Sequence, residues 1–123
     1  MPYAKVNGVN LYYESYGDGD PVVLIGGLGS QLQSWATQVP LYSKHFQVVV
    51  FDNRGSGKSD KPEERYSTAD MANDTAALMS ELGIESAHVV GKSMGGMIGQ
   101  WLAINHPQKV QKLVLDCSIA SRS

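Results

Sequence analysis

Ser93 is the residue whose neighbours point most directly to chemistry. It lies in the pentapeptide Gly-Lys-Ser-Met-Gly at 91–95, directly after an apolar run and directly before a helix-like segment. This arrangement is typical of a nucleophile elbow, a tight strand-to-helix turn in which small neighbours let the backbone fold back and expose the serine hydroxyl. A serine presented in this way can attack a carbonyl carbon. We therefore predict that Ser93 is a nucleophile for acyl transfer.

The elements that must position Ser93 alternate between strands and helices. Two β-rich segments flank Asn7-Gly8, a strong signal for a tight turn, so we expect a leading antiparallel hairpin over 3–16. Short apolar runs, typical of strands buried on both faces of a parallel sheet, follow at 22–25, 47–51, 87–90 and 113–115.

Helical patterns separate these runs. They cover 35–44, 68–82 and 93–106, and in the last of them Met94, Ile98, Trp101 and Leu102 form an apolar stripe. Repeated strand, helix and strand units imply right-handed crossovers. The predicted fold class is therefore α/β, a three-layer, mostly parallel open sheet with helices on both faces.

The composition is that of an ordinary globular domain. The 123 residues are 42% hydrophobic and 18% charged, so we expect a single domain over 1–123 with a short flexible tail at 118–123. A net charge of -2 without a basic stripe argues against nucleic acid or membrane partners. The chain has no signal-like apolar segment. Cys117 is the only cysteine, so no intrachain disulfide can form and we expect a cytoplasmic protein.

Three segments, taken together in this order, resemble the α/β-hydrolase fold family. They are 24–29, 51–60 and 91–96, and they follow the leading hairpin. The chain is most similar to the esterase, lactonase and haloperoxidase-like branch, in which the loop after the third strand faces the elbow after the fifth. The resemblance covers nearly the whole chain, and it implies a core that ends here after the sixth strand.

The resemblance also implies an oxyanion hole made of two backbone N–H groups. One belongs to Met94, which follows the nucleophile, and the other to Leu28 in the loop Gly26-Gly27-Leu28-Gly29. Members of the family commonly carry a histidine where this chain has Gly26. The backbone donor survives that change, but the loop loses a packing group. We expect Gly91 and Gly95 to shape the elbow itself.

Two other motifs imitate catalytic or binding sites. Lys92 is adjacent to Ser93, but successive side chains at a strand end point in opposite directions, which argues against Lys92 as a base. Gly57-Lys58-Ser59 is similar to the end of a phosphate-binding loop, yet Asp52 stands where that motif needs glycine and Pro62 blocks the required helix. We interpret Asp52 and Arg54 as residues that stabilise their own loop.

The general base is the missing part of the predicted site. In the family, the acid and then the histidine follow the serine along the chain. Strand geometry places His88 about 16 Å from Ser93, helix geometry places His106 roughly 20 Å away, and His45 falls at the opposite edge of the sheet. Asp116 follows the last predicted strand, beside the elbow strand, where some members of the family place the triad acid.

A sheet that ends at 110–116 has an unpaired edge strand. Exposed strand edges and apolar faces tend to pair with another chain, so we predict a homodimer or a complementing C-terminal fragment. The base could come from outside this chain.

Two functional interpretations therefore stand. The first is a serine hydrolase acting on small carboxylic esters or lactones, with haloperoxidase or perhydrolase chemistry sharing the same nucleophile. The second is a weak or inactive hydrolase-derived fragment that serves as an oligomeric scaffold or binding module. The sequence has no metal-ligand spacing and no dinucleotide-binding glycine pattern, so we expect neither a metal nor an organic cofactor.

Overall fold

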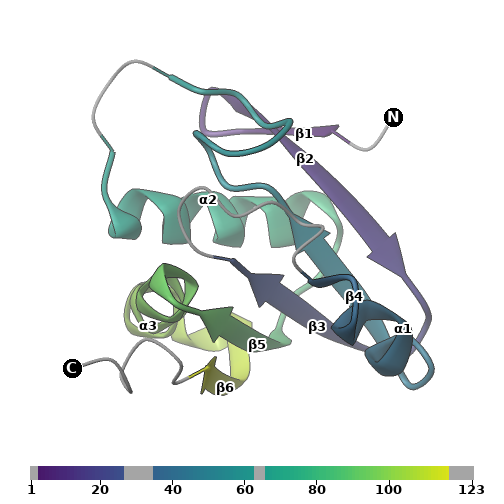
Figure 1. Ribbon diagram of the computed structural model, residues 1–123. Helices are drawn as coiled ribbons and strands as arrows, with labels where there is room; N and C mark the ends of the chain where they lie inside the picture. Colours follow the sequence, from purple (N-terminus) through teal and green to yellow (C-terminus); the bar gives the residue numbers. More distant parts are fainter. Residues whose placement is uncertain (1–2, 27–34, 63–65, 117–123) are drawn as a thin grey trace.

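The computed structural model describes residues 3–26, 35–62 and 66–116 (Figure 1). Strands and helices alternate along the chain as the apolar runs and helical periodicities predict. The elements are β1 (Tyr3–Val6), β2 (Val9–Tyr16), β3 (Asp20–Ile25), α1 (Gln38–Tyr42), β4 (Phe46–Phe51), α2 (Thr68–Glu81), β5 (Ala87–Lys92), α3 (Met94–Asn105), a short 3-10 helix (Pro107–Lys109) and β6 (Val110–Asp116). The first helix is shorter than the predicted 35–44, because only its central five residues are α-helical.

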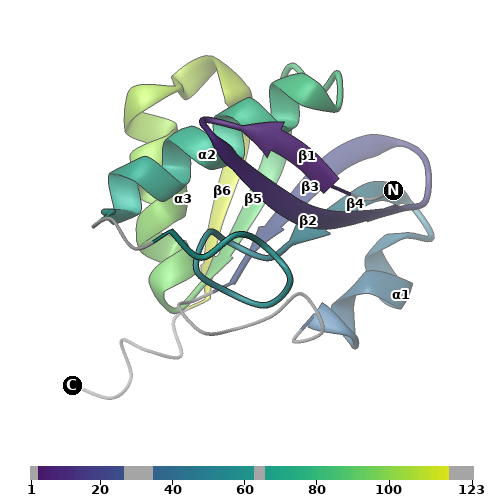
Figure 2. The same cartoon turned by 90° about the horizontal axis from the view of Figure 1, so that it is seen from above.

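The strands form one six-stranded sheet in the order β1-β2-β4-β3-β5-β6. β1 and β2 are antiparallel to their neighbours, whereas β4, β3, β5 and β6 run parallel. Figure 2 shows α1 on one face of this sheet and α2 with α3 on the other. The predicted three-layer, mostly parallel α/β fold with helices on both faces is confirmed.

Side-chain alternation along the strands builds a core on each face of the sheet. The larger core joins residues of β1 to β5 to the inward faces of α2 and α3, with Leu11, Val23, Met71, Ile98 and Leu102 fully buried. The smaller core lies on the α1 face and contains Val22, Leu24, Trp35, Val48 and Val50. Because the parallel strands face both cores, they read as continuous apolar runs in the sequence.

The stripe predicted for the last helix is wrong at one position. Ile98 and Leu102 are fully buried, but Trp101 is 40% exposed and lies with Met97 and Ile104 on the outward side of α3. A helix with apolar residues on two sides gives no periodicity that distinguishes the buried side from the exposed one.

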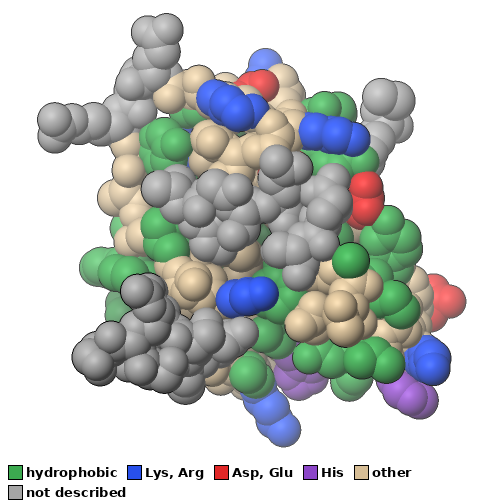
Figure 3. Space-filling view, viewed as in Figure 1, with side chains coloured by type: hydrophobic (Ala, Val, Ile, Leu, Met, Phe, Trp, Pro, Cys, Tyr) green, Lys and Arg blue, Asp and Glu red, His purple; other side chains and the backbone are tan. Residues whose placement is uncertain are grey.

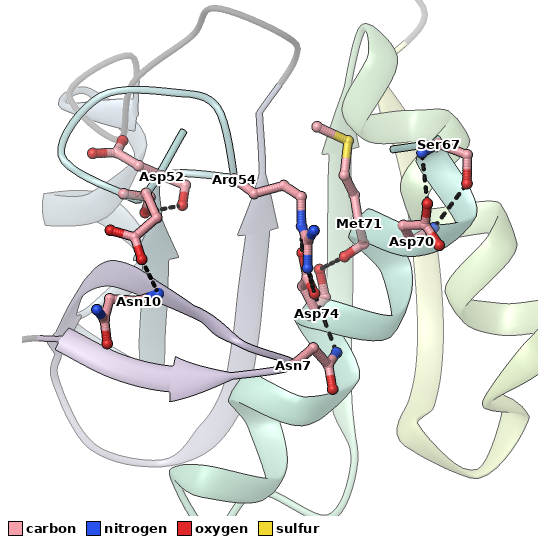
Figure 4. A network of polar contacts seen from close by, with 11 residues as sticks. Asn7, Asn10, Asp52, Arg54, Ser67, Asp70, Met71 and Asp74 are labelled. Atoms are coloured by element: carbon pink, nitrogen blue, oxygen red, sulfur yellow. Dashed lines mark hydrogen bonds and ion pairs between the residues drawn. The ribbon is translucent and has the colours of Figure 1, made fainter. Parts of the chain in front are cut away.

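A partly buried ion pair joins the loop after β4 to α2 (Figure 4). Arg54 donates from Nε and Nη2 to the two carboxylate oxygens of Asp74, at 2.6 and 2.9 Å, and these hydrogen bonds raise the pKa of Arg54 above its usual value. Asn7, in the turn between β1 and β2, donates to the same carboxylate at 3.1 Å. The hairpin, the loop and the helix are thus fixed to one another through Asp74, which is 2% exposed.

The segment 52–60 is held as a structural loop along β2. Backbone N–H groups of β2 donate to Ser59 Oγ and Asp60 Oδ2, each at 2.8 Å. The carboxylate of Asp52 accepts the backbone N–H of Lys58 at 3.0 Å, and the Lys58 ammonium lies 4.7 Å from the ring centroid of Tyr12. These contacts occupy the residues that imitate a phosphate-binding loop.

Three further features of the described residues concern membrane spans, metal ligands and basic side chains. None of the helices in 3–26, 35–62 and 66–116 is long and apolar enough to cross a lipid bilayer. Within the same ranges, no three His, Cys, Asp or Glu side chains gather where they could hold a metal ion. Figure 3 shows the Lys and Arg side chains of one face lying singly and apart from one another. Cys117 and the predicted tail at 118–123 lie outside the described residues.

Candidate active site

Ser93 has an unusual backbone conformation. It stands between the last residue of β5 and the first residue of α3, with φ 57° and ψ −125°. Apart from glycines, the only described residues with positive φ are Asn7, which forms the hairpin turn, and Ser93. Such a conformation costs on the order of 1–3 kcal/mol and persists only where the surrounding structure enforces it. The strained residue is therefore the serine that the sequence motif singles out.

Glycines on both sides of Ser93 permit the sharp turn. A Cβ atom on Gly91 would lie 2.7 Å from Cα of Gly96, inside the first turn of α3. A Cβ atom on Gly95 would lie 2.7 Å from the carbonyl carbon of Ile25 and 2.9 Å from the carbonyl oxygen of Gly26. Real Cβ atoms essentially never approach other heavy atoms this closely. The elbow thus packs backbone against backbone on the end of β3.

The first turn of α3 leaves backbone N–H groups without a side-chain cap. The first N–H groups of any α-helix have no intrahelical acceptor, and the Ser93 side chain makes no capping hydrogen bond. The Gly96 N–H donates to the Ser93 carbonyl at 2.9 Å, which closes the turn. The positive end of the helix dipole therefore lies at the serine, where it favours negative charge. Met94, the predicted oxyanion donor, is the first residue of this turn and is half-buried.

The register of the sheet brings the ends of three strands together. Ile25 of β3 pairs with Gly91 of β5, and Lys92 of β5 pairs with Asp116 of β6. The backbone of Asp116, the predicted acid, is therefore next to the elbow strand at the same edge of the sheet as Ser93. Gly26 continues β3 toward this edge and is buried, whereas Gly27, Leu28 and Gly29 lie outside the described residues.

The Lys92 side chain contacts a residue of the smaller core. Its ammonium lies 5.7 Å from the ring centroid of Trp35, which is 2% exposed. A cation over an indole face is a stabilising contact in its own right. The Lys92 ammonium is therefore engaged with a buried aromatic ring of the smaller core.

The three histidines lie at the far edge of the sheet from Ser93. His88 is near the amino end of β5 and meets the ring of Phe46 edge to face, with ring centroids 6.2 Å apart. His45 directly precedes β4. His106 follows the last residue of α3, and its Nε2 lies 2.9 Å from Oδ1 of Asn73 on α2. In the described structure, each of these histidines therefore stands at the opposite end of its element from the elbow.

Sequence reasoning overlooked Asn53. Its side-chain Nδ2 donates to the carbonyl oxygen of Gly26 at 3.1 Å, and Asn53 is 2% exposed. The only signal in the sequence was its place two residues after the predicted strand 47–51, since parallel strands end at a common edge of the sheet. No local motif marks an asparagine for contact with a glycine 27 residues earlier.

Comparison with known proteins agrees on one family. A family model described as alpha/beta hydrolase fold matches residues 20–123. A putative carbamate hydrolase, RutD, from Azorhizobium caulinodans is 36% identical over 115 residues, covering 94% of this chain and 43% of that protein. A putative non-heme bromoperoxidase, BpoC, from Mycobacterium tuberculosis is 42% identical over 109 residues, covering 87% of this chain and 41% of that protein.

Solved structures give the same result. The N-acyl homoserine lactone degrading enzyme Est816 superposes with a TM-score of 0.89 at 37% identity, covering 93% of this chain and 44% of that one. The enol-lactonase from Burkholderia xenovorans LB400 superposes with a TM-score of 0.88 at 39% identity, covering 91% and 45%. The chain therefore spans less than half the length of the relatives it matches.

Proposed function

Because the chain belongs to the alpha/beta hydrolase fold family, we propose that it provides the nucleophile of a serine hydrolase acting on small carboxylic esters or lactones. The observation that carries this proposal is the strained backbone of Ser93, at φ 57°, in the turn between β5 and α3. Strain of this kind is found where the surrounding structure holds a residue for function. The glycines at 91 and 95 provide that support.

In the proposed reaction, Ser93 Oγ attacks the carbonyl carbon of the ester or lactone. The carbonyl oxygen takes up negative charge, which the N–H of Met94 and the N–H of Leu28 stabilise together with the dipole of α3. Collapse of this intermediate expels the alcohol and leaves an acyl group on Ser93. Water then attacks the acyl group and releases the acid, which restores the serine.

The proton of Ser93 needs an acceptor during the attack. Since the described histidines stand at the opposite edge of the sheet, we assign the base to a complementing segment or to a partner subunit. Asp116 is our candidate for the acid that orients that base, because it is the last residue of β6 and its backbone pairs with Lys92 of the elbow strand.

The substrate class rests on the similar proteins. An N-acyl homoserine lactone degrading enzyme and an enol-lactonase are among the solved structures that this chain superposes on, and both names describe lactone chemistry. A carbamate hydrolase and a bromoperoxidase, both named as putative, are also among the similar proteins. Carbamate hydrolysis and haloperoxidase or perhydrolase chemistry would share the Ser93 nucleophile. Lactones and simple esters are therefore the first substrates to test.

We also propose that the apolar surface beyond β6 and α3 is covered by a second copy or by a complementing C-terminal segment. Val114 and Leu115 of β6 are 54% and 40% exposed, and Met97 of α3 is 53% exposed. Light scattering coupled to gel filtration measures the oligomeric state directly, and a stable monomer at micromolar concentration would contradict the homodimer.

We also propose a cytoplasmic location. The support is the single cysteine at 117, since one cysteine cannot form an intrachain disulfide. Cell fractionation would test this location.

The test of the proposed function is ester turnover by the protein and by Ser93→Ala. In the presence of the segment or subunit that supplies the base, the protein should hydrolyse p-nitrophenyl acetate and form a phosphonate adduct on Ser93, visible by mass spectrometry, and Ser93→Ala should lose both. Ser80→Ala, which removes a hydroxyl from the exposed side of α2, is the matched control and should behave like the parent protein. Equal turnover in parent and Ser93→Ala, with no adduct, would instead favour a scaffold or binding module.

A further inference from the structure

The carbonyl oxygen of Gly26 lies where three segments meet. Gly26 directly follows the last residue of β3. Its carbonyl oxygen accepts a hydrogen bond from Asn53 Nδ2 at 3.1 Å and would lie 2.9 Å from a Cβ atom placed on Gly95. Asn53 belongs to the loop after β4, and Gly95 belongs to the first turn of α3. One backbone oxygen is therefore held between the nucleophile elbow and an asparagine side chain.

The orientation of the Asn53 amide follows from chemistry. A backbone carbonyl oxygen can only accept a hydrogen bond, so the atom of Asn53 that faces Gly26 must be the nitrogen. The amide oxygen Oδ1 then faces elsewhere. It is buried, and it accepts no hydrogen bond from the part of the chain that the structure describes.

The loop that carries Asn53 has its own anchors. Its backbone is fixed to β2 through Ser59 and Asp60, and the Asn53 carbonyl accepts the backbone N–H of Ser56 at 2.9 Å. In the described ranges, the Asn53 amide makes only the hydrogen bond to Gly26. The side chain therefore connects a well-anchored loop to a glycine that has no side chain with which to pack.

We propose that Asn53 is a positioning residue for acyl transfer at Ser93. It holds the Gly26 peptide against Gly95 and so fixes the end of β3 relative to the elbow. Asn53 acts through Gly26 and does not touch the substrate. This inference rests on the proposed function, because it concerns how well the transition-state oxyanion is stabilised after attack by Ser93. It also explains how Gly26 is held in place without a side chain.

Asn53→Asp is the sharpest test, because it keeps the shape of the side chain and replaces the donor with an acceptor. A carboxylate beside the Gly26 carbonyl repels it and moves the end of β3. Displacements near 1 Å cost on the order of 100-fold in rate, so kcat for p-nitrophenyl acetate should fall about 10- to 100-fold with KM changed by less than about twofold. Asn105→Asp, the same change at the exposed end of α3, should have no effect.

A trifluoromethyl ketone gives a second readout that depends on the oxyanion. Ser93 Oγ adds to its carbonyl carbon, the hydroxyl proton leaves to the base or solvent, and the ketone oxygen becomes an alkoxide. In Asn53→Asp, the inhibition constant should rise by the same factor by which kcat falls. Lowering the pH should restore part of the activity, since a protonated carboxyl can donate to Gly26 as the amide does. The parent protein should not show that acid recovery.

Ser59→Ala separates positioning from general loosening of the loop. It removes the hydroxyl that accepts the Tyr12 N–H and donates to the Asp52 carbonyl, but it leaves the contact with Gly26 in place. It should lower the melting temperature and leave kcat within about twofold of the parent value. Ser93-dependent turnover that is equal in parent and Asn53→Asp would overturn the inference alone. Turnover that persists in Ser93→Ala would overturn the proposed function and the inference together.

Discussion

α2 and α3 pack on the same face of the sheet and share one core, yet their first turns are built in opposite ways. The N-cap residue of α2 is Ser67, which has an extended backbone conformation. Its hydroxyl accepts the Asp70 N–H at 3.1 Å. The Asp70 carboxylate accepts the Ser67 N–H at 2.8 Å in return, which completes a capping box (Figure 4). The N-cap residue of α3 is Ser93, which has a positive φ and makes no side-chain capping hydrogen bond.

The difference separates a turn built for stability from a turn built for chemistry. In α2 a side-chain hydroxyl and a carboxylate already satisfy the exposed N–H groups and complement the dipole. In α3 the same kind of residue, a serine, makes no side-chain cap, so the N–H groups at the start of the helix are not occupied by its hydroxyl. This arrangement lowers stability in two ways, because Ser93 has a strained backbone and the first turn of α3 has no side-chain cap.

The outward sides of the two helices differ as well. α2 exposes Asn73, Ser80 and Glu81, whereas α3 exposes Met97, Trp101 and Ile104. Polar residues leave the outside of α2 in contact with water. A contiguous apolar stripe of this kind on α3 is typical of a surface that another protein segment covers.

The largest effect should come from crowding the elbow. Gly95→Ala places a methyl group against the carbonyl of Ile25, where backbone atoms cannot move aside, and should destabilise the protein by about 3 kcal/mol. The reactivity of Ser93 toward a phosphonate should fall with it. Urea denaturation and labelling kinetics measure the two effects.

Gly96→Ala is the matched control for this crowding. Its added methyl would lie 3.5 Å from a methyl carbon of Leu115, an ordinary contact, and alanine favours a helix interior by roughly 0.5–1 kcal/mol over glycine. We expect unchanged or slightly higher stability. Equal destabilisation by both substitutions would show that the start of α3 responds to helix composition and not to the elbow.

The second largest effect should come from the ion pair that anchors α2. Asp74→Asn leaves Arg54 without its charge partner in a site where Arg54 is 14% exposed, and should cost about 2 kcal/mol. Asp18→Asn, at an exposed position, is the charge-matched control. If unfolding midpoints show no difference between the two variants, the anchoring of α2 does not depend on this pair.

Ser67 and Ser93, the N-cap residues of α2 and α3, should change the stability of the protein in opposite directions when their side chains are removed. Ser67→Ala removes the cap and should lower stability by about 1 kcal/mol. Ser93→Gly relieves the positive φ and should raise stability by about 1 kcal/mol while abolishing adduct formation. Thermal unfolding of both variants checks the signs, and a loss of stability in Ser93→Gly would contradict the strain assigned to the elbow.

The smallest expected effect concerns the hydrogen bond between Tyr12 and Glu14 on β2. Neither residue belongs to α2 or α3, so this pair serves as a reference for the comparison of the two helices. A hydrogen bond from the Tyr12 hydroxyl to Glu14 raises the pKa of Tyr12 from 10.0 to about 12, with smaller contributions from burial and charge. A raised pKa favours the neutral phenol, so this contribution to stability is complete below pH 10 and is lost as the pH rises through about 12.

Glu14→Gln should move the phenolate titration of Tyr12 back toward 10, as followed by ultraviolet absorbance. Glu85→Gln, at an exposed site in the turn after α2, should leave that titration in place. Stability at neutral pH should be nearly unchanged in both variants, because exposed contacts of this kind contribute little. An unchanged titration in Glu14→Gln would mean that the carboxylate does not hold the phenol.

Local sequence was sufficient to predict most of the fold. Apolar runs of three to five residues marked the parallel strands, Asn7-Gly8 marked the hairpin turn, and the pentapeptide at 91–95 marked the elbow. These features depend on side-chain periodicity and turn chemistry within a few residues. Trp101 was misplaced because apolar residues on two sides of α3 look alike in the sequence.

The sequence by itself determined the identity of the candidate nucleophile, the type of each strand and α-helix, and the α/β class. Only the tertiary structure decided which loops meet at Ser93. Because β3 lies between β4 and β5 in the sheet, the residues that follow both neighbours converge on its end. Asn53 reaches Gly26 across 27 residues, and Asn7 reaches Asp74 across 67. Contacts of that range depend on strand order and register, which no short stretch of sequence encodes.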